Sequence, residues 1–252
     1  MIPAEYRMAA RVARALREAG EPRPARELAY RALAMPSLAA TQLERVIEPV
    51  LDGRFFREED ALGLWEWRYG FPQPGEALVV IDLETTGLSP SENEIIEIAL
   101  MRVEAGRVER FSRLVDPGTP IPPFITRLTG ISSADVAGAP DVYEVLEEAL
   151  VYLEDAVLVI QNAPFDLGFL RPRARRLGVK IQNEVIDTVQ WARRALPRMK
   201  RRGLDHLIKA FEVTYTTGAR HRALGDVEAT WAVAREMYYI LTAGEPKRVL
   251  EV

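Results

Sequence analysis

The feature that most constrains this chain is a pair of acids inside an apolar segment, VVIDLETTGL, at residues 79–88. Its β-branched and aliphatic residues predict a buried strand, yet carboxylates are seldom buried unless they are paired or bind a metal. Because side chains two apart on a strand share a face, Asp82 and Glu84 project together, and Ile81 and Leu83 point to the opposite face. The simplest alternative is a frayed strand end with both acids in solvent. A cation between the acids would relieve their repulsion, and carboxylate oxygens suit hard cations such as Mg²⁺.

Length and composition set the class of protein. The 252 residues allow one large domain or two modest ones, and 48% hydrophobic with 28% charged residues is ordinary for a soluble globular chain. No apolar run approaches the roughly 20 residues that span a bilayer, the N-terminus lacks the apolar region of a secretory signal, and the absence of cysteine excludes disulfides and thiolate metal sites. We therefore expect a cytoplasmic protein with no membrane partner. The net charge of -4 gives no global reason to expect a polyanionic partner, so the distribution of charge matters more.

The order of the expected elements divides the chain at a Pro/Gly-rich linker. Residues 1–70 predict a small N-terminal module of amphipathic helices and a hairpin, which resembles a winged helix without a specific signature. Residues 71–76, FPQPGE, form the linker. Residues 77–244 predict an α/β domain with one mixed sheet flanked by helices, and residues 245–252 form a short tail. Four aromatic residues near the linker are expected to pack rather than to stack on bases: Trp65, Trp67, Tyr69 and Phe71.

Two further acids lie near the starts of expected helices. Asn162 is placed as the N-cap of one helix, with Pro164 and Asp166 in its first turns. Asp226 opens the last long helix, and His221 lies five residues before it. Taken alone, each acid is explained by the favourable interaction of a carboxylate with the positive end of a helix dipole. Neither acid by itself therefore indicates a metal site.

The motifs D-x-E-T-T-G, N-x-x-F-D and H-x-x-x-x-D occur in this order between Asp82 and Asp226. Together they resemble the DEDD superfamily of 3′–5′ exonucleases, and the histidine five positions before the last Asp resembles its His-containing branch. The epsilon proofreading subunit of bacterial DNA polymerase III and its stand-alone homologues belong to that branch. The phrases LTGISSADVAGAP and IDTVQWAR are also similar to this group. The resemblance covers residues 77 to about 241 and implies a ribonuclease H-like exonuclease fold after the winged-helix-like module.

The resemblance implies a site for two divalent metal ions, Mg²⁺ or Mn²⁺. Four acids would bind them, with the first bridging both ions, and a histidine would be the general base that deprotonates the attacking water. Two metals roughly 3.5–4 Å apart neutralise the scissile phosphate and stabilise the leaving oxygen, and an ordinary His pKa near about 6.5 suits a base at neutral pH. The candidate catalytic residues are Asp82, Glu84, Asp166, Asp226 and His221, of which the four acids are the metal ligands. The candidate substrate-binding residues are Thr85, Thr86 and Gly87, whose turn would offer backbone N–H groups to a phosphate, with Asn162 and Phe165.

Three nearby polar residues receive other interpretations. Gln161 stands where the family often has a His before the Asn of the second motif. That position is not a metal ligand in the family, so we expect activity to survive the change. Asp187 follows an expected strand and precedes a helix, so it is expected to cap the helix rather than bind metal. His206, in LDHLIKAF, is expected on a helix surface or in packing.

Basic residues gather between the second and third acidic motifs. Such a run is commonly a solvated helix face, but its position here favours a track for nucleic acid. The cluster comprises Arg171, Arg173, Arg175, Arg176, Lys180, Arg193, Arg194, Arg198, Lys200, Arg201 and Arg202.

The sequence thus predicts a metal-dependent 3′–5′ exonuclease that acts on single-stranded or frayed DNA 3′ ends in proofreading or repair and releases 5′-mononucleotides. An RNA 3′-end trimming enzyme is an alternative, because recognition of the 2′-OH depends on pocket geometry. A non-catalytic nucleic-acid-binding scaffold is another, and the presence of all four acids and the histidine argues against it. A DNA polymerase subunit is the protein partner considered, with docking assigned to residues 1–70.

Overall fold

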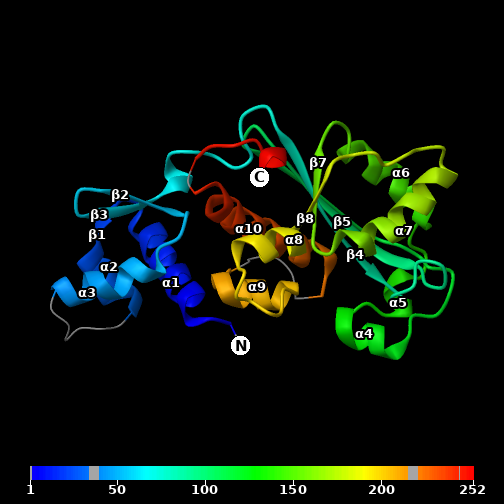
Figure 1. Cartoon of the computed structure of the whole chain (residues 1–252). Helices are drawn as coiled ribbons and strands as arrows, with labels where there is room; N and C mark the ends of the chain where they lie inside the picture. Colours follow the sequence, from blue (N-terminus) through cyan, green and yellow to red (C-terminus); the bar gives the residue numbers. More distant parts are fainter. Residues whose placement is uncertain (1, 34–39, 215–220, 244) are drawn as a thin grey trace. The chain divides into compact units, whose positions relative to one another are not determined.

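The structure is a computed structural model that describes residues 2–33, 40–214, 221–243 and 245–252 (Figure 1). Its contacts divide the chain into two compact units. The first unit contains Met1–Gln73, Trp191–Thr214 and Ala232–Val252, and the second contains Pro74–Gln190 and Tyr215–Trp231. In the described part of the chain, no helix is both long and apolar enough to cross a membrane.

A five-stranded sheet in the order β6-β5-β4-β7-β8 forms the centre of the second unit. β4 pairs antiparallel with β5 and parallel with β7, while β5–β6 is antiparallel and β7–β8 is parallel. The predicted mixed sheet is therefore confirmed. The strands are β4 (Ala77–Thr85), β5 (Ile95–Glu104), β6 (Arg107–Leu114), β7 (Val157–Ile160) and β8 (Val185–Asp187).

The Ala-Gly pair at residues 105–106 forms the tight turn between β5 and β6. Ala105 and Gly106 have φ angles of 48° and 79°. Two successive positive φ angles match the right-handed twist of the flanking strands, which is why short hairpin loops adopt them. The hairpin places β5 between β6 and β4, so that one long strand adjoins the acid-bearing strand over its whole length.

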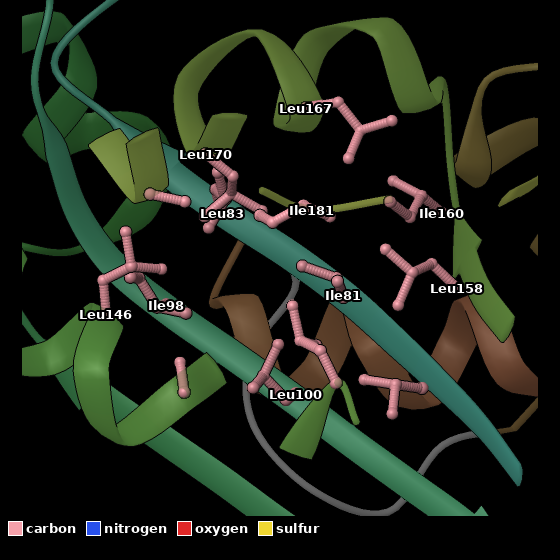
Figure 2. Close-up of a cluster of buried hydrophobic side chains, with 14 of the residues drawn as sticks. Ile81, Leu83, Ile98, Leu100, Leu146, Leu158, Ile160, Leu167, Leu170 and Ile181 are labelled. Atoms are coloured by element: carbon pink, nitrogen blue, oxygen red, sulfur yellow. The ribbon is translucent and has the colours of Figure 1, made fainter. Parts of the chain in front are cut away.

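Two helices, α6 (Val142–Tyr152) and α7 (Ala163–Arg176), pack on one face of this sheet and bury its apolar side chains. Figure 2 shows Ile81 and Leu83 of β4 in this core, among leucines of α6 and α7. Ile81 is 1% and Leu83 5% exposed, and full burial of such a side chain contributes about 1.5–3 kcal/mol. The alternation of the strand then directs Asp82 and Glu84 to the opposite face, as the sequence predicted.

The other helices of the second unit are α4 (Pro123–Thr129) and α5 (Ser133–Val136), together with the first parts of α8 (Thr188–Ala195) and α10 (Ala223–Thr242). α4 and α5 contribute to a second, small apolar cluster that includes Ile96 of β5. α10 begins at Ala223, so Asp226 lies in its first turn rather than at its start. The predicted start was late because the Ala223 N–H donates to Glu97 Oε2 at 3.1 Å, a cap supplied by a distant strand.

The first unit contains the predicted N-terminal helices and hairpin. The hairpin strands join a short strand in an antiparallel sheet of order β1-β3-β2. The N-terminal elements are α1 (Ala4–Ala19), β1 (Arg23–Pro24), α2 (Ala25–Leu33), α3 (Ala40–Ile47), η1 (Glu48–Val50), β2 (Phe55–Glu58), β3 (Ala61–Leu64) and η2 (Trp65–Trp67). Far along the chain, α9 (Leu204–Phe211) and η3 (Val249–Glu251) belong to the same unit.

A buried ion-pair network ties the N-terminal residues to the end of α10 within this unit. Arg54 and Glu236 are each 2% exposed, and Arg54 Nη1 donates to Glu236 Oε2 at 2.7 Å. Asp52 pairs with Arg54, and Arg17 pairs with both Glu236 and Glu66. Burial alone would raise the pKa of Glu236, but Arg54 and Arg17 hold that pKa below its ordinary value. The N-terminal module thus shares its compact unit with residues distant in sequence.

The predicted packing role of the aromatic residues near the linker is confirmed for three of them. The Trp65 ring lies 5.5 Å from the Phe56 ring and 5.4 Å from the Tyr69 ring. Phe71 stacks on Tyr238 with ring centroids 4.6 Å apart. These rings therefore stabilise the first unit.

Candidate active site

Three carboxylates from two elements meet at one place in the second unit. Asp82 and Glu84 come from β4, and Asp226 comes from the first turn of α10. One oxygen of each lies within 4.8 Å of the others, with Asp226 buried and the other two half-buried. Among the described residues, this is the group of acids and histidines with the spacing of metal ligands. Its donors are all carboxylate oxygens, the type that Mg²⁺ and Mn²⁺ prefer.

Asp166, in the first turn of α7, contacts the same strand beyond the point where its pairing with β7 ends. β7 pairs with β4 only as far as Ile81 opposite Ile160, and α7 follows at once. Two residues further along β4, the Leu83 N–H donates to the Asp166 carboxylate. Asp166 therefore contacts the backbone between the two acids of β4, although it lies outside the 4.8 Å group.

The protonation of Asp166 is strongly perturbed. Its side chain is 2% exposed. Burial raises its pKa to about 8, with a further contribution from the negative charge of Asp187, against the lowering effect of amide hydrogen bonds from Asp166 itself and Leu83. A carboxyl group that holds a proton near neutral pH is typical of functional sites.

His221 lies just before α10 and is half-buried. Its φ angle is 62°, in the left-handed region that residues other than glycine seldom adopt. Such a conformation costs of order 1–3 kcal/mol and persists only where the surroundings impose it. His221 lies two residues before the first residue of α10 and outside the 4.8 Å group of carboxylates.

Two charged residues beside this site were missed in the sequence. Glu97 of β5 is 2% exposed and pairs with Arg222, the residue after His221. Glu97 is one of several acids in the strand-like segment EIIEIAL. The only signal for it is its position opposite Glu84, which depends on the register of β4 against β5.

The predicted turn after β4 is held by its own side chains. Thr85 Oγ1 donates to the Gly87 carbonyl at 2.7 Å, and the Glu94 N–H donates to Thr86 Oγ1 at 2.9 Å. The Thr86 N–H itself donates to the Glu94 carbonyl, so this amide holds the loop together. A Cβ at Gly87 would lie 2.6 Å from Asn93 Oδ1, so a larger residue there would require the Asn93 side chain to move.

At the start of α7, the predicted capping is only partly right. Asn162 occupies the N-cap position, but its side chain makes no cap hydrogen bond and its φ angle is 62°. Its backbone N–H instead donates to Asp187 Oδ1 at 3.3 Å, and asparagine tolerates this left-handed conformation better than most residues. Asn162 is thereby exposed, and Phe165 is half-buried with its ring 5.2 Å from that of Phe169.

The structure agrees with the interpretations of Asp187 and His206 and shows what Gln161 contacts. Asp187 Oδ1 accepts from the Val189 N–H at 2.8 Å, which confirms the predicted capping of α8. Gln161 Oε1 accepts from the Thr188 hydroxyl at 2.5 Å, so this side chain joins two strand ends. His206 is half-buried on α9, as expected.

The basic cluster divides between the two units. Arg173 is 7% exposed and bonds to Glu94 Oε2 at 2.6 Å, so its assignment to a nucleic-acid surface was wrong. Arg171 and Arg175 do line an open groove of about 560 Å³ along α7, which begins at Ala163 and Asp187. In the first unit, Arg194 and Arg198 pair with the Val252 carbonyl and with Glu5. Residues four apart on a helix share a face, which is why α7 presents two cations together.

Comparison with known families shows which family the chain belongs to. Residues 79–234 match the RNase_T family, described as exonuclease. The chain belongs to this family. The match contains the acids of β4, α7 and α10 as well as His221, and the predicted ribonuclease H-like exonuclease fold of the second unit, a mixed sheet flanked by helices, is confirmed.

Curated relatives of this exonuclease are far longer proteins. The chain is 44% identical over 154 residues to DNA polymerase III PolC-type of Streptococcus mutans, covering 60% of this chain and 10% of the relative. It is 39% identical over 175 residues to the PolC-type enzyme of Caldanaerobacter subterraneus, covering 69% and 12%. The chain therefore spans about a tenth of the length of these relatives.

Solved structures give the same fold. Exonuclease X in complex with 5′ overhanging duplex DNA aligns with a TM-score of 0.52 and 28% identity, covering 67% of this chain and 99% of that chain. Escherichia coli Exonuclease I in complex with a dA16 oligonucleotide aligns with a TM-score of 0.55 and 20% identity, covering 68% and 42%. At 20% identity the second likeness shows the fold alone.

Proposed function

We propose that this protein is a metal-dependent 3′–5′ exonuclease that hydrolyses phosphodiester bonds at single-stranded or frayed DNA 3′ ends and releases 5′-mononucleotides, in proofreading or repair. One observation carries the proposal: Asp82, Glu84 and Asp226 bring carboxylate oxygens within 4.8 Å of one another. Three carboxylates held so close repel one another, and a divalent cation between them would relieve that repulsion. A fold that assembles them is therefore best explained by binding of divalent metal.

The donor set fits two Mg²⁺ or Mn²⁺ ions, because every donor is a hard oxygen. Asp82, Glu84, Asp226 and Asp166 would hold the ions, with Asp82 shared between them. When bound, the ions supply charge neutralisation at the scissile phosphate and lower the pKa of water. Asp166 has a pKa of about 8 in the metal-free protein. Binding of a cation is therefore expected to release its proton.

Side chains around the acids would supply the general base and the contacts to the terminal nucleotide. His221 would accept the proton of the attacking water, a role that a positioned imidazole commonly fills. The exposed Asn162 and the half-buried Phe165 would contact the terminal nucleotide from the start of α7. Leu88, 84% exposed just after the Thr85–Gly87 turn, offers an apolar surface to a nucleobase.

DNA is proposed over RNA because of the relatives. The matched proteins from Streptococcus mutans and Caldanaerobacter subterraneus are named DNA polymerases, and the aligned Exonuclease X is bound to DNA. We extend this to a partner, and propose that residues 1–70 dock on a polymerase subunit.

The direct test uses a single strand labelled at its 5′ end, as DNA and as RNA of the same sequence, with Mg²⁺, with Mn²⁺ and with EDTA. A 3′–5′ exonuclease shortens the labelled DNA one nucleotide at a time, only with metal, and degrades the RNA more slowly. The Asp82→Asn variant serves as the inactive control and Asp155→Asn, an exposed acid in the turn before β7, as the matched active control.

Three results would contradict the proposal. Release of a labelled mononucleotide as the first product would show the opposite polarity. Hydrolysis in EDTA, or by Asp82→Asn at the wild-type rate, would remove the acids from the chemistry. Faster cleavage of the RNA would favour the RNA-trimming alternative.

The N-terminal module is proposed to be winged-helix-like and separable from an exonuclease domain at residues 77–244. Its element order α1-β1-α2-α3-β2-β3 and its sheet order β1-β3-β2 support this proposal. The hairpin tip carries the exposed acids Glu58, Glu59 and Asp60, which disfavours contact with a phosphate backbone and favours a protein partner. A fragment of residues 77–252 should still degrade DNA, with a lower Tm because Glu236 loses Arg17 and Arg54. A folded but inactive fragment would contradict the division.

A further inference from the structure

We propose that Glu97 and Arg222 act as a positioning pair that fixes His221 and Asp226 against the acids of β4. The inference rests on the proposed function for its kinetic consequences. The pair itself binds neither substrate nor metal in this proposal. It acts by tying the first turn of α10 to β5.

The carboxylate of Glu97 is fully engaged by groups from the other elements. Arg222 Nε donates to Oε2 at 3.1 Å and Arg222 Nη2 to Oε1 at 3.0 Å, a two-bond pair with fixed orientation. The Ala223 N–H donates to Oε2 at 3.1 Å, and the Ser112 hydroxyl donates to Oε1 at 3.2 Å. At 2% exposure, Glu97 would be a costly burial without these partners.

The register of the sheet explains why an arginine is needed here. Glu97 lies directly opposite Glu84 across β4 and β5, so their side chains share one face of the sheet. Like charges at such positions destabilise a sheet. Arg222 offsets both, since the pKa of Arg222 is raised chiefly by its hydrogen bond to Glu97 and further by the charge of Glu84.

The same pair sets the start of α10. The cap on Ala223 fixes where the helix begins, and the Asp226 N–H donates to the Arg222 carbonyl at 3.1 Å. The rotation that directs Asp226 toward Asp82 therefore depends on the placement of Arg222. His221, one residue earlier, holds a φ angle of 62° that its own side chain does not favour. A fixed neighbour supplies the constraint that such a conformation requires.

Loss of Glu97 would also redirect Arg222. Without its buried partner, the guanidinium is left near Glu84, which belongs to the cluster of acids. Pairing of Arg222 with Glu84 would then compete with metal. Partners of this kind, placed behind metal ligands, typically change metal affinity or activity by 10–100-fold, about the effect expected here.

The test compares Glu97→Gln, Arg222→Ala and the double variant in the full chain. The matched control is Arg110→Ala, because Arg110 Nε donates to Glu228 Oε1 at 3.0 Å and also ties α10 to the sheet, but at an exposed position. Four quantities are measured: kcat and KM on a single-stranded oligonucleotide, the Mn²⁺ concentration for half-maximal rate, and Tm in EDTA.

A spectroscopic measurement reports on His221 without any turnover. The chain has two histidines, so ¹³C labelling of the Cε1 position of the imidazole rings gives two signals, of which His206→Gln identifies one. In EDTA, the His221 signal should shift or broaden in Glu97→Gln and Arg222→Ala and stay unchanged in Arg110→Ala. This readout holds even if the wild-type protein proves inactive on DNA, so failure of the proposed function is distinguishable from failure of the pair.

The expected kinetic result is a loss of about 10–100-fold in kcat with KM little changed in both single variants, and a higher Mn²⁺ requirement in Glu97→Gln. The double variant should recover Tm, since no buried charge is left unpaired, but should not recover kcat or the His221 signal. If Tm and kcat recover together, or if the singles lower Tm while the His221 signal and kcat match wild type, the pair is only structural and the proposal is overturned.

Discussion

The close approach of three carboxylates predicts that removal of one charge stabilises the metal-free protein. Replacing Asp82 by asparagine keeps the shape of the side chain and removes two of the three repulsive pairs of the cluster, those with Glu84 and with Asp226. Two unit charges 4.8 Å apart repel by about 0.9 kcal/mol in bulk water and by about 3.5 kcal/mol at an effective dielectric constant of 20. Because Asp82 and Glu84 are half-buried, and because one acid can relieve repulsion by binding a proton, we take the lower value for each pair.

The metal-free Asp82→Asn protein is therefore expected to be more stable than wild type by about 2 kcal/mol, a rise in Tm of about 4–8 °C for a domain of this size. Metal should reverse the order. A divalent ion at a hundred times its Kd stabilises the wild type by about 2.7 kcal/mol, whereas the variant should gain little and should release no mononucleotides.

Differential scanning calorimetry in EDTA and in excess Mn²⁺ provides the measurement, with Asp155→Asn as the control for loss of one exposed acid. A lower Tm of Asp82→Asn in EDTA would show that Asp82 is satisfied without metal. An undiminished rise in Tm with Mn²⁺ would show that the ion binds elsewhere. Either result would refute the assignment of Asp82 as the shared ligand.

Three further outcomes are expected. In EDTA the free energy of unfolding should fall as pH rises from about 4 toward 8. The folded pKa of Asp166 is raised from 3.8 to about 8, so the folded state binds an extra proton in that window. Urea denaturation along this pH range provides the measurement, and a free energy that rises with pH would contradict the prediction. Arg54→Met should destabilise the first unit by about 3–5 kcal/mol by leaving Glu236 buried and unpaired, and adding Glu236→Leu should recover much of the loss in the same measurement. Replacing Arg171 and Arg175 by alanine should reduce the salt dependence of single-strand binding by about 1.4 in the log–log slope, measured by fluorescence anisotropy; an unchanged slope would remove the α7 groove from the binding surface.

Most of the fold follows from local patterns in the sequence. The alternation in residues 79–88 predicted that Asp82 and Glu84 share one face of β4, because strand geometry acts over two residues. The helices of the N-terminal module were likewise predicted from the amphipathic spacing of their residues.

What the sequence misjudged depends on partners far along the chain. Arg173 was assigned to a nucleic-acid surface because its neighbours are basic, but Glu94 and Asn93 bind its guanidinium and leave it only 7% exposed. Asparagine is a preferred capping residue, yet the Asn162 side chain makes no cap hydrogen bond, and its backbone N–H donates to Asp187. In each case a contact between distant residues overrode a sound local preference.

By itself, the sequence determined the identities of the acids and the histidine, their order, and the shared face of the first two, since strand geometry acts over two residues. Only the tertiary structure decided that Asp226 joins Asp82 and Glu84 within 4.8 Å, that Asp166 meets the Leu83 amide in a buried place, and that Glu97 holds Arg222. These contacts depend on strand register and on the placement of α7 and α10. Both result from packing of the whole core, which no local stretch of sequence specifies.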